Sequence, residues 1–352
     1  MSDSNAVRYL ADATDDRALS LRKLWDTKVR EQFHPRTVFY DRQNTIAEYR
    51  DIGRAKSHQV IQFADLPDPA NYRPGAEMLG QNYGFSEITL TIDDWVVDHH
   101  DIPMDQGAYI DWNPVSKIAA RMASKLAENM DKKLAIIGVN AARTAAKTIT
   151  VGSDTLTVHN GGNVVERTAA SLAAAYPSTL TGSKTFQEDL AQQAQLMNED
   201  NVPMEGRYAF IGPYMQRVLT RDDTLFSRDY QNGRSDFASR SIGKVEGFEI
   251  IPTNHLPSTS FGDLDLGGTP AIPLASKYQG DFTTATEGQP AALILCGASM
   301  GEAAIGIVTG GGLRTDMWYD PRRQTLFLYA AIHFGANVLS PYCAGEIRVD
   351  AA

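Results

Sequence analysis

The stretch NPVSKIAARMASKLAENMDKKLAIIGVNAARTAAK, residues 113–147, is the clearest helix in the sequence. Asn113 is a favoured N-cap residue, and Pro114 is tolerated at the first helical position, where no N–H group is needed. An apolar stripe at helical spacing follows, made of Ile118, Met122, Leu126, Met130, Leu134 and Ile137. The charged residues expected elsewhere on the helix surface are Arg121, Lys125, Asp131 and Lys132. At about 1.5 Å per residue the helix would be on the order of 50 Å long, which predicts an elongated molecule built along one spine.

The segment before this helix, ITLTIDDWVVDHHDIPMDQGAYIDWNP (residues 88–114), contains four adjacent potential metal ligands, Asp98, His99, His100 and Asp101. Neighbouring residues on a strand point to opposite faces, so His99 and Asp101 share one face and Asp98 and His100 the other. A zinc site needs ligands that converge tetrahedrally. We therefore interpret this stretch as a polar strand end that packs against the spine helix or a neighbouring subunit. A metal-dependent hydrolase that uses these four residues remains an alternative, as do histidine contacts whose charge changes near about pH 6.

Residues 59–92 predict an extended hairpin. One strand begins at Val60, and the other runs from Glu87 to Ile92 with alternating apolar and Thr residues. The proline-rich tip between them has too little apolar surface to fold inward, and long loops in compact domains are usually functional. We expect this hairpin to reach toward a partner.

The N-terminal region contains one helix, from Ala18 to Phe33, which Pro35 ends. It shows no core of its own and is interpreted as an arm that packs on something else. For Trp25 and Phe33, packing within the subunit and contact with a neighbour both remain open.

The second half predicts a compact α/β unit. The expected helices cover residues 186–199 and 214–219, and the expected strands cover residues 208–211, 248–251, 292–295, 305–308 and 324–329. The loop at residues 257–288 is rich in Gly, Pro, Ser and Thr with few large apolar residues, so we expect it to be mobile or dependent on a partner.

No catalytic constellation emerges from the rest of the sequence. TGGGL (residues 309–313) lacks the Lys-Ser/Thr of a phosphate-binding loop and predicts a turn or bulge between strands. Cys296 lacks the flanking glycines of a nucleophile elbow and predicts an inert, buried thiol. We expect no enzyme activity, no cofactor and no bound metal.

The charge and the composition exclude further classes of protein. The formal net charge of the 352 residues is -10, and the basic residues are dispersed, which argues against direct binding of nucleic acid. No run approaches the roughly 20 apolar residues of a membrane span, and the polar, acidic N-terminus does not resemble a signal peptide. Two cysteines provide no disulfide framework. We expect synthesis in a reducing cytoplasm.

Five stretches in succession carry a resemblance to a known family: EYRDIGRAKSHQVIQFADLPDPANYRPGAEM (48–78), SEITLTIDDWVVDHHDIPMDQGAYIDW (86–112), LAENMDKKLAIIGVNAA (126–142), NEDNVPMEGRYAFIGPYMQRVL (198–219) and GFEIIPTNHLP (247–257). Together they resemble the major capsid proteins of tailed bacteriophages with the Hong Kong 97-like fold, most closely those of short-tailed phages of the T-seven group.

The resemblance implies an α+β fold with a peripheral domain and an α/β axial domain. Its parts would be an N-terminal arm (1–55), an extended β-hairpin (56–92), a peripheral domain with the spine helix and a small strand insert (93–185), an axial domain (186–299), strands that return through the peripheral domain (300–335) and a C-terminal return to the axial domain (336–352).

The resemblance also implies synthesis in the cytoplasm of a bacterial host and a structural function in the virion. Hexamers and pentamers of the chain would form an icosahedral head around double-stranded DNA, which lies near the wall without being specifically bound. About fifty residues precede the hairpin, so we expect a separate scaffolding protein and no maturation cleavage. A portal protein and a decoration or cement protein are further expected partners. A bacterial encapsulin, which shares the fold and assembles unaided, is the alternative shell protein.

Eight residues are the candidates for contacts between subunits. In the hairpin, Phe63, Leu66, Tyr72 and Pro74 should press on a neighbour. The candidates for intersubunit ion pairs are Arg50 and Arg54 at the base of the hairpin, together with Glu77 and Asp98. Such pairs are individually worth little when they are exposed.

Overall fold

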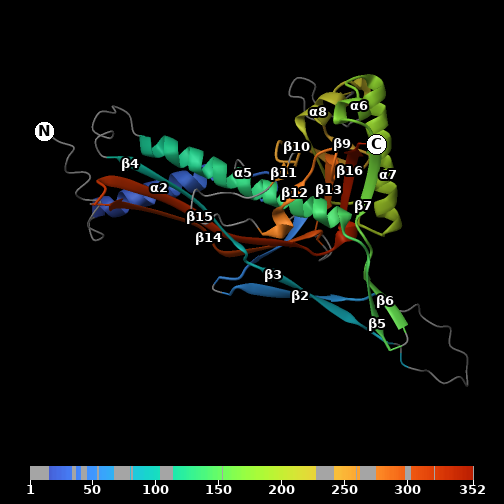
Figure 1. Cartoon of the computed structure of the whole chain (residues 1–352), viewed down its shortest axis with the longest axis horizontal. Coiled ribbons are helices and arrows are strands. Elements are labelled where there is room, and N and C mark those ends of the chain that lie inside the picture. The colour runs from blue at the N-terminus through green and yellow to red at the C-terminus, as the bar shows by residue number, and fades with distance from the viewer. Residues whose placement is uncertain are drawn as a thin grey trace, which may run out of the picture.

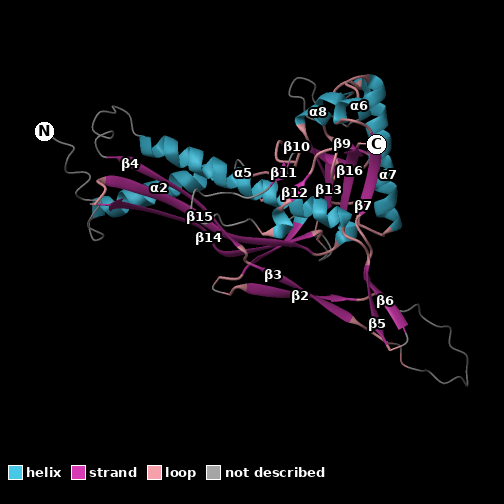
Figure 2. Ribbon diagram, in the orientation of Figure 1, coloured by secondary structure: helices cyan, strands magenta, loops and turns pink. Residues whose placement is uncertain are grey.

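The molecule is elongated, with a long helix that joins two separate sheets and a two-stranded arm beneath them (Figure 1). This computed structural model describes residues 16–33, 37–40, 46–53, 55–66, 80, 82–103, 114–152, 154–226, 242–258, 260–261, 275–297, 303–320 and 322–351. The helices and strands in Figure 2 confirm the α+β class expected from the sequence. Within the described residues, no helix is long and apolar enough to cross a membrane.

The spine helix is α5, Pro114–Arg143, with 30 residues. The predicted stripe is buried from Met122 to Ile137, and Ile118 packs against its edge. The helix ends at Arg143 rather than at Lys147, because the carbonyl oxygen of Thr144 accepts the N–H of Gly162 at 2.8 Å. Lys147 already pairs with the next strand. α5 contacts both large sheets, which makes it the shared core element of the molecule.

The first sheet has four strands in the order β1-β14-β15-β4, with β1 parallel to β14 and the other pairs antiparallel. Its strands are β1 Ala47–Asp51, β4 Asp94–Pro103, β14 Ile305–Asp320 and β15 Thr325–Val338. β14 and β15 are much longer than predicted. TGGGL does not separate two strands, because it forms a bulge inside β14 where the register with β15 shifts. Gly311 and Gly312 adopt positive φ there, so the glycines permit the strand to continue.

The second sheet has six strands in the order β7-β16-β13-β8-β10-β9. Its strands are β7 Asn163–Thr168, β8 Arg207–Ile211, β9 Lys244–Val245, β10 Phe248–Pro252, β13 Gln289–Cys296 and β16 Ala344–Asp350. The helices around this sheet are α6 Leu172–Ala175, α7 Leu180–Glu199 and α8 Pro213–Leu219, with short 3-10 turns η3 Asp223–Phe226 and η5 Pro341–Cys343. The end of α5 is fixed to this sheet, because the Arg143 guanidinium forms two 2.7 Å hydrogen bonds to the buried carboxylate of Glu346.

Three two-stranded units complete the fold. The predicted hairpin is β2 Ser57–Phe63 with β3 Phe85–Thr91, and a second hairpin is β5 Lys147–Val151 with β6 Asp154–His159. The third unit pairs β11 Ser260–Phe261 with β12 Gly280–Asp281, beside the 3-10 turn η4 Ser276–Tyr278. The expectation of a mobile loop at 257–288 is wrong for its last part, because Tyr278 and Phe282 are fully buried in the main core.

The predicted arm helix is α2, Asp16–Phe33, and it packs on α5 and β14. Trp25, Val29 and Phe33 are buried in the main core of their own chain, which decides the question left open by the sequence. The chain then continues to Phe39, whose ring stacks on Phe210 of β8 at a centroid distance of 4.2 Å.

Asp131 of α5 holds this N-terminal segment in place. The prediction of a surface position is wrong, because the Asp131 side chain is fully buried. Its carboxylate accepts the backbone N–H groups of Val38, Phe39 and Tyr40, the last at 3.2 Å, and lies 3.0 Å from Nδ1 of His255. A buried carboxylate is tolerated where donors surround it. One side chain therefore ties the spine helix to the arm and to the loop after β10.

Asp131→Ala should lower the free energy of unfolding of the unassembled subunit by about 2–3 kcal/mol, because buried N–H groups of residues 38–40 would lose their acceptor. Urea unfolding followed by tryptophan fluorescence measures this change. Asp223→Ala, at an exposed acid of η3, is the matched control and should change stability by less than about 0.5 kcal/mol. Equal effects of the two substitutions would contradict the role given to Asp131.

Candidate subunit-contact surfaces

The β2–β3 hairpin has one face on the body of the molecule and one face in solvent. Residues alternate in burial along both strands, as the two-residue period of a strand requires. The inner face includes Val60, Ile88 and the fully buried Leu90, which pack with Val308 and Leu339. Gln62 also donates to the carbonyl oxygen of Leu339 at 2.9 Å. The inner face therefore fixes the hairpin to the sheet.

The outer face of the hairpin is apolar and uncovered by its own chain at the end that carries Phe63 and Phe85, and it becomes polar toward the body from Glu87 onward. Phe63 and Phe85 lie directly opposite each other in the register, next to Ile61, and the three side chains are 72%, 62% and 59% exposed. Leu66 and Tyr83, just beyond the strand ends, are also exposed. We call Ile61, Phe63, Leu66, Tyr83 and Phe85 the outer hairpin face. A contiguous exposed apolar surface on an otherwise folded protein is typical of an interaction site.

The root of the hairpin depends on a close approach of two backbones. A Cβ atom at Gly335 of β15 would overlap the carbonyl oxygen of Thr91, where β3 ends. Near the same root, Asp51 accepts the N–H groups of Gly53 and of Gly311 in the β14 bulge, each at 3.0 Å. These backbone hydrogen bonds hold the pKa of Asp51 below its ordinary value. The direction in which the hairpin leaves the body is therefore set by glycines and one carboxylate.

The predicted contact residues fall into separate places. Phe63 and Leu66 lie on the outer hairpin face, and their role as contacts stays a prediction. Arg50 forms an exposed ion pair with Glu48 of its own strand at 3.2 Å. Asp98 lies on β4, away from the hairpin, so it does not join Arg50 in one cluster. Arg54, Tyr72, Pro74 and Glu77 lie outside the described residues.

The Asp98–Asp101 stretch forms no convergent site. Asp98 and His100 share one face of β4, with Nε2 of His100 3.3 Å from Asp98 Oδ1. His99 points to the other face, where its ring stacks on Phe327 at 5.6 Å. The predicted division of the two faces is thus confirmed. No group of three or more potential metal ligands occurs within the described part of the chain.

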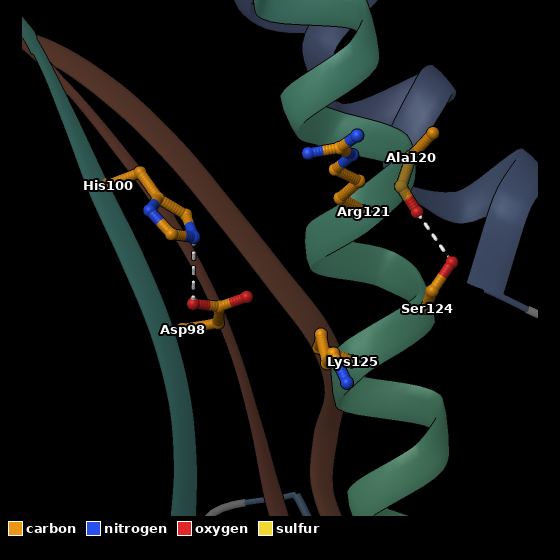
Figure 3. A pocket seen from close by; sticks show the side chains of 6 residues that line it. All are labelled: Asp98, His100, Ala120, Arg121, Ser124 and Lys125. Carbon is orange, nitrogen blue, oxygen red and sulfur yellow. Dashed lines mark hydrogen bonds and ion pairs between the residues drawn. The ribbon is translucent and has the colours of Figure 1, made fainter.

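Asp98 and His100 face α5 across a groove with a volume of about 640 Å³ (Figure 3). Ala120, Arg121, Ser124 and Lys125 line its other wall. Burial raises the pKa of Asp98, and the two neighbouring histidines oppose this rise. We call this space the β4–α5 groove. The sequence predicted that this stretch packs against the spine helix or a neighbouring subunit, and the contact of β4 with α5 confirms the first alternative. The sequence did not show which residues of α5 form the other wall.

The opposite face of the four-stranded sheet carries aromatic side chains. The Trp318 ring stacks on Phe327 at 4.4 Å, and Trp95 meets His333 edge to face at 4.5 Å. Burial, together with the charge of Arg314, lowers the pKa of His333. Trp95 and Trp318 remain exposed. These rings were not singled out from the sequence, although the alternation of Trp318 with buried Met317 is a signal for an outward position.

Cys296 is buried at the end of β13, and burial raises its pKa to about 12. Its Sγ lies 3.7 Å from Sδ of Met197. The prediction of a buried thiol is confirmed, and a thiol in such surroundings is expected to be a poor nucleophile.

Comparison with known proteins identifies the family that these surfaces belong to. The family model Gp10A-like: Major capsid protein matches residues 68–348 of the chain. The match begins after β1 and β2 and covers β3, the spine helix and the other strands of both large sheets, to within two residues of the end of β16. No curated protein has a significantly similar sequence.

Three solved capsid structures show the same fold. In the capsid of the cyanophage P-SCSP1u, the similar chain is 24% identical with a TM-score of 0.72, and 90% of this chain and 89% of that chain are covered. The mature capsid of bacteriophage PhiM1 gives 13% identity and a TM-score of 0.66, with 89% and 87% covered. The capsid of Ralstonia phage GP4 gives 13% identity and a TM-score of 0.56, with 90% and 92% covered.

Phe63→Ser combined with Phe85→Ser should leave the free energy of unfolding of the isolated subunit within about 1 kcal/mol of wild type, because both rings are exposed. The same variant should lose self-association, measured by sedimentation velocity. Leu90→Ala, on the inner face, is the control and should cost about 2–5 kcal/mol of stability. Normal self-association of the double variant would refute the role of the outer hairpin face.

Gly335→Ala should lower the free energy of unfolding by about 2 kcal/mol, because the new methyl group overlaps the backbone at the hairpin root. Gly80→Ala, in the hairpin region with no atom within 4 Å of the added carbon, should change it by less than about 0.5 kcal/mol. Thermal unfolding of both variants measures the difference. Similar melting temperatures of the two variants would show that the close approach at Gly335 does not determine the stability of the subunit.

Proposed function

Because this chain belongs to the Gp10A-like family of major capsid proteins, we propose that its copies associate head to tail into hexamers and pentamers of an icosahedral head. The chain is a structural protein of the virion capsid and not an enzyme.

The outer hairpin face is the observation that carries the proposal. It lies on an arm that projects from the body of the molecule (Figure 1), with Phe63 and Phe85 more than half exposed. The hairpin projects from one side of the subunit, so its surface differs from the surface of the body that it would meet on a neighbouring copy. This favours a heterologous contact, in which the hairpin of one copy packs on the body of the next. Heterologous contacts generate rings when the rotation between copies closes. The same contact repeated around five or six copies gives the two kinds of ring that a closed shell needs.

Assembly is proposed to require a separate scaffolding protein and a portal protein. A subunit that enters both hexamers and pentamers makes similar contacts at different angles, so its contacts alone do not select one shell size. A decoration or cement protein on the outer surface is a further proposed partner. The stretches quoted from the hairpin and spine also support the narrower kinship with short-tailed phages of the T-seven group.

The enclosed DNA is proposed to lie near the wall without specific binding. The net charge of -10 repels phosphates at long range and keeps a packaged duplex from adhering. Sequence-specific or tight DNA binding by a protein of this charge would need a concentrated basic surface.

The division of the chain into parts belongs to the proposal. The ranges are an arm (1–55), a hairpin (56–92), a peripheral domain (93–185), an axial domain (186–299), returning strands (300–335) and a C-terminal return (336–352). Two strands pair with a strand from a different part of this division. β1, in the arm range, pairs with β14, and β7, in the peripheral range, pairs with β16.

Expression of the chain alone and with scaffolding proteins of related phages tests the proposal. We expect closed, uniform shells with a scaffolding protein, sized by sedimentation and seen by negative-stain microscopy. Without it, aggregates or irregular particles are expected. Uniform shells from the chain alone would contradict the requirement for scaffold and favour an encapsulin-type shell. A discrete dimer or tetramer under every condition would contradict assembly itself.

A further inference from the structure

The β4–α5 groove has a net positive wall in a negatively charged protein. Within the described part of the chain Arg121 makes no ion pair. Lys125 and Lys132 share one carboxylate, Glu128, at 3.0 and 2.7 Å. The helix wall therefore carries more positive than negative charge. Figure 3 shows Arg121 and Lys125 beside the space that separates α5 from β4.

Asp98 can offset only one of the two cationic side chains, Arg121 and Lys125, that line the groove. It is the one carboxylate among the described residues that line the groove, and it is paired with His100 at 3.3 Å on the opposite strand. The groove thus offers cationic groups on the helix side and an imidazole on the strand side. Small side chains, Ala120 and Ser124, keep the space between them open.

The opposite edge of the molecule presents a surface with the complementary charge. The last two residues of α7 and the loop that follows, residues 198–206, expose Glu199, Glu205 and Met204, whose side chain is 71% exposed. Asp200 of this loop accepts hydrogen bonds from Asn160 and Asn163. Among the described residues, no lysine or arginine forms an ion pair with Glu199, Asp200 or Glu205. We call residues 198–206 the acidic loop.

Hydrogen bonds from Arg207 hold the acidic loop in one conformation. Arg207 is buried and donates to the carbonyl oxygens of Pro203 at 2.9 Å and Val202 at 2.6 Å, and to the side chain of Asn198 at 2.8 Å. Asn201 and Gly206 adopt positive φ at the two bends. A braced loop loses little conformational entropy when it docks.

These two surfaces cannot meet within one copy. Figure 1 places α7 at one edge of the molecule, whereas β4 and the first half of α5 extend to the other edge. Between two copies in a head-to-tail arrangement they can face each other. We propose that the β4–α5 groove receives the acidic loop of a second copy, with Met204 against Ala120 and with Glu199 and Glu205 facing Arg121 and Lys125.

The chemistry favours a protein loop over a nucleic acid in this groove. A nucleic acid would gain little counterion release from Arg121 and Lys125, the two cationic side chains among the described residues that line the groove. A loop with one apolar side chain between two carboxylates matches both the small side chains and the cations. The inference deepens the proposed function, on which it rests, because it assigns a second contact to the same head-to-tail association.

Charge reversal on each side and on both sides tests the proposal. Arg121→Glu with Lys125→Glu, and separately Glu199→Lys with Glu205→Lys, should each lower the yield of shells about tenfold or more, because like charges then face each other across the contact. The chain that carries all four substitutions should recover shells, because opposite charges face each other again. Yield is measured by sedimentation with the scaffolding protein present.

A conservative variant, Arg121→Lys with Lys125→Arg, is the matched control. It keeps the charge and should assemble like wild type. Circular dichroism of every variant establishes that the subunit folds.

Normal shells from either reversed pair, or no recovery in the fourfold variant, would overturn the inference. If the wild-type chain forms shells in the same experiment, the proposed function holds even where the groove contact is refuted. If the wild-type chain forms no shells, the result counts against the proposed function itself.

Discussion

The burial of helix α5 against two sheets is the constraint on which the rest of the structure depends. One face of the helix supplies a core to the four-stranded sheet near its start and to the six-stranded sheet near its end. Two buried carboxylates fix its position, Asp131 through backbone N–H groups and Glu346 through Arg143. Because a single rigid rod joins the sheets, surfaces far apart in the molecule keep a constant relation to each other. A subunit that tiles a shell needs this property.

The hairpin follows from the same constraint. Its inner face is anchored by Leu90 and Val308, while Phe63 and Phe85 on the outer face have no covering element in their own chain. The hairpin cannot turn over to bury these rings without exposing the anchored face, since residues alternate strictly along a strand. The apolar surface is therefore an enduring feature of the isolated subunit, and a neighbouring copy is the element that would bury it.

Local patterns predicted much of this fold, and long-range packing decided what they missed. The stripe from Met122 to Ile137 and the alternation from Glu87 to Ile92 depend on residue spacing alone, so the helix and the hairpin were found. Asp131 was misplaced because a charged residue next to an apolar stripe gives no sign of the N–H groups that meet it from residues 38–40. The buried Tyr278 was missed for the same reason, within a polar stretch. Of the residues predicted to make contacts, Phe63 and Leu66 are exposed, and their contact role stays a prediction. The packing of β4 on the spine helix was predicted, whereas the residues of α5 that face it depend on long-range packing that no local pattern encodes.

A cryo-electron microscopy reconstruction of particles assembled from this chain tests the central claim most directly. We expect copies arranged around fivefold and sixfold axes, with Phe63 and Phe85 of each hairpin covered by the next copy in the ring. A small closed oligomer, or a shell in which both rings face solvent, would contradict it.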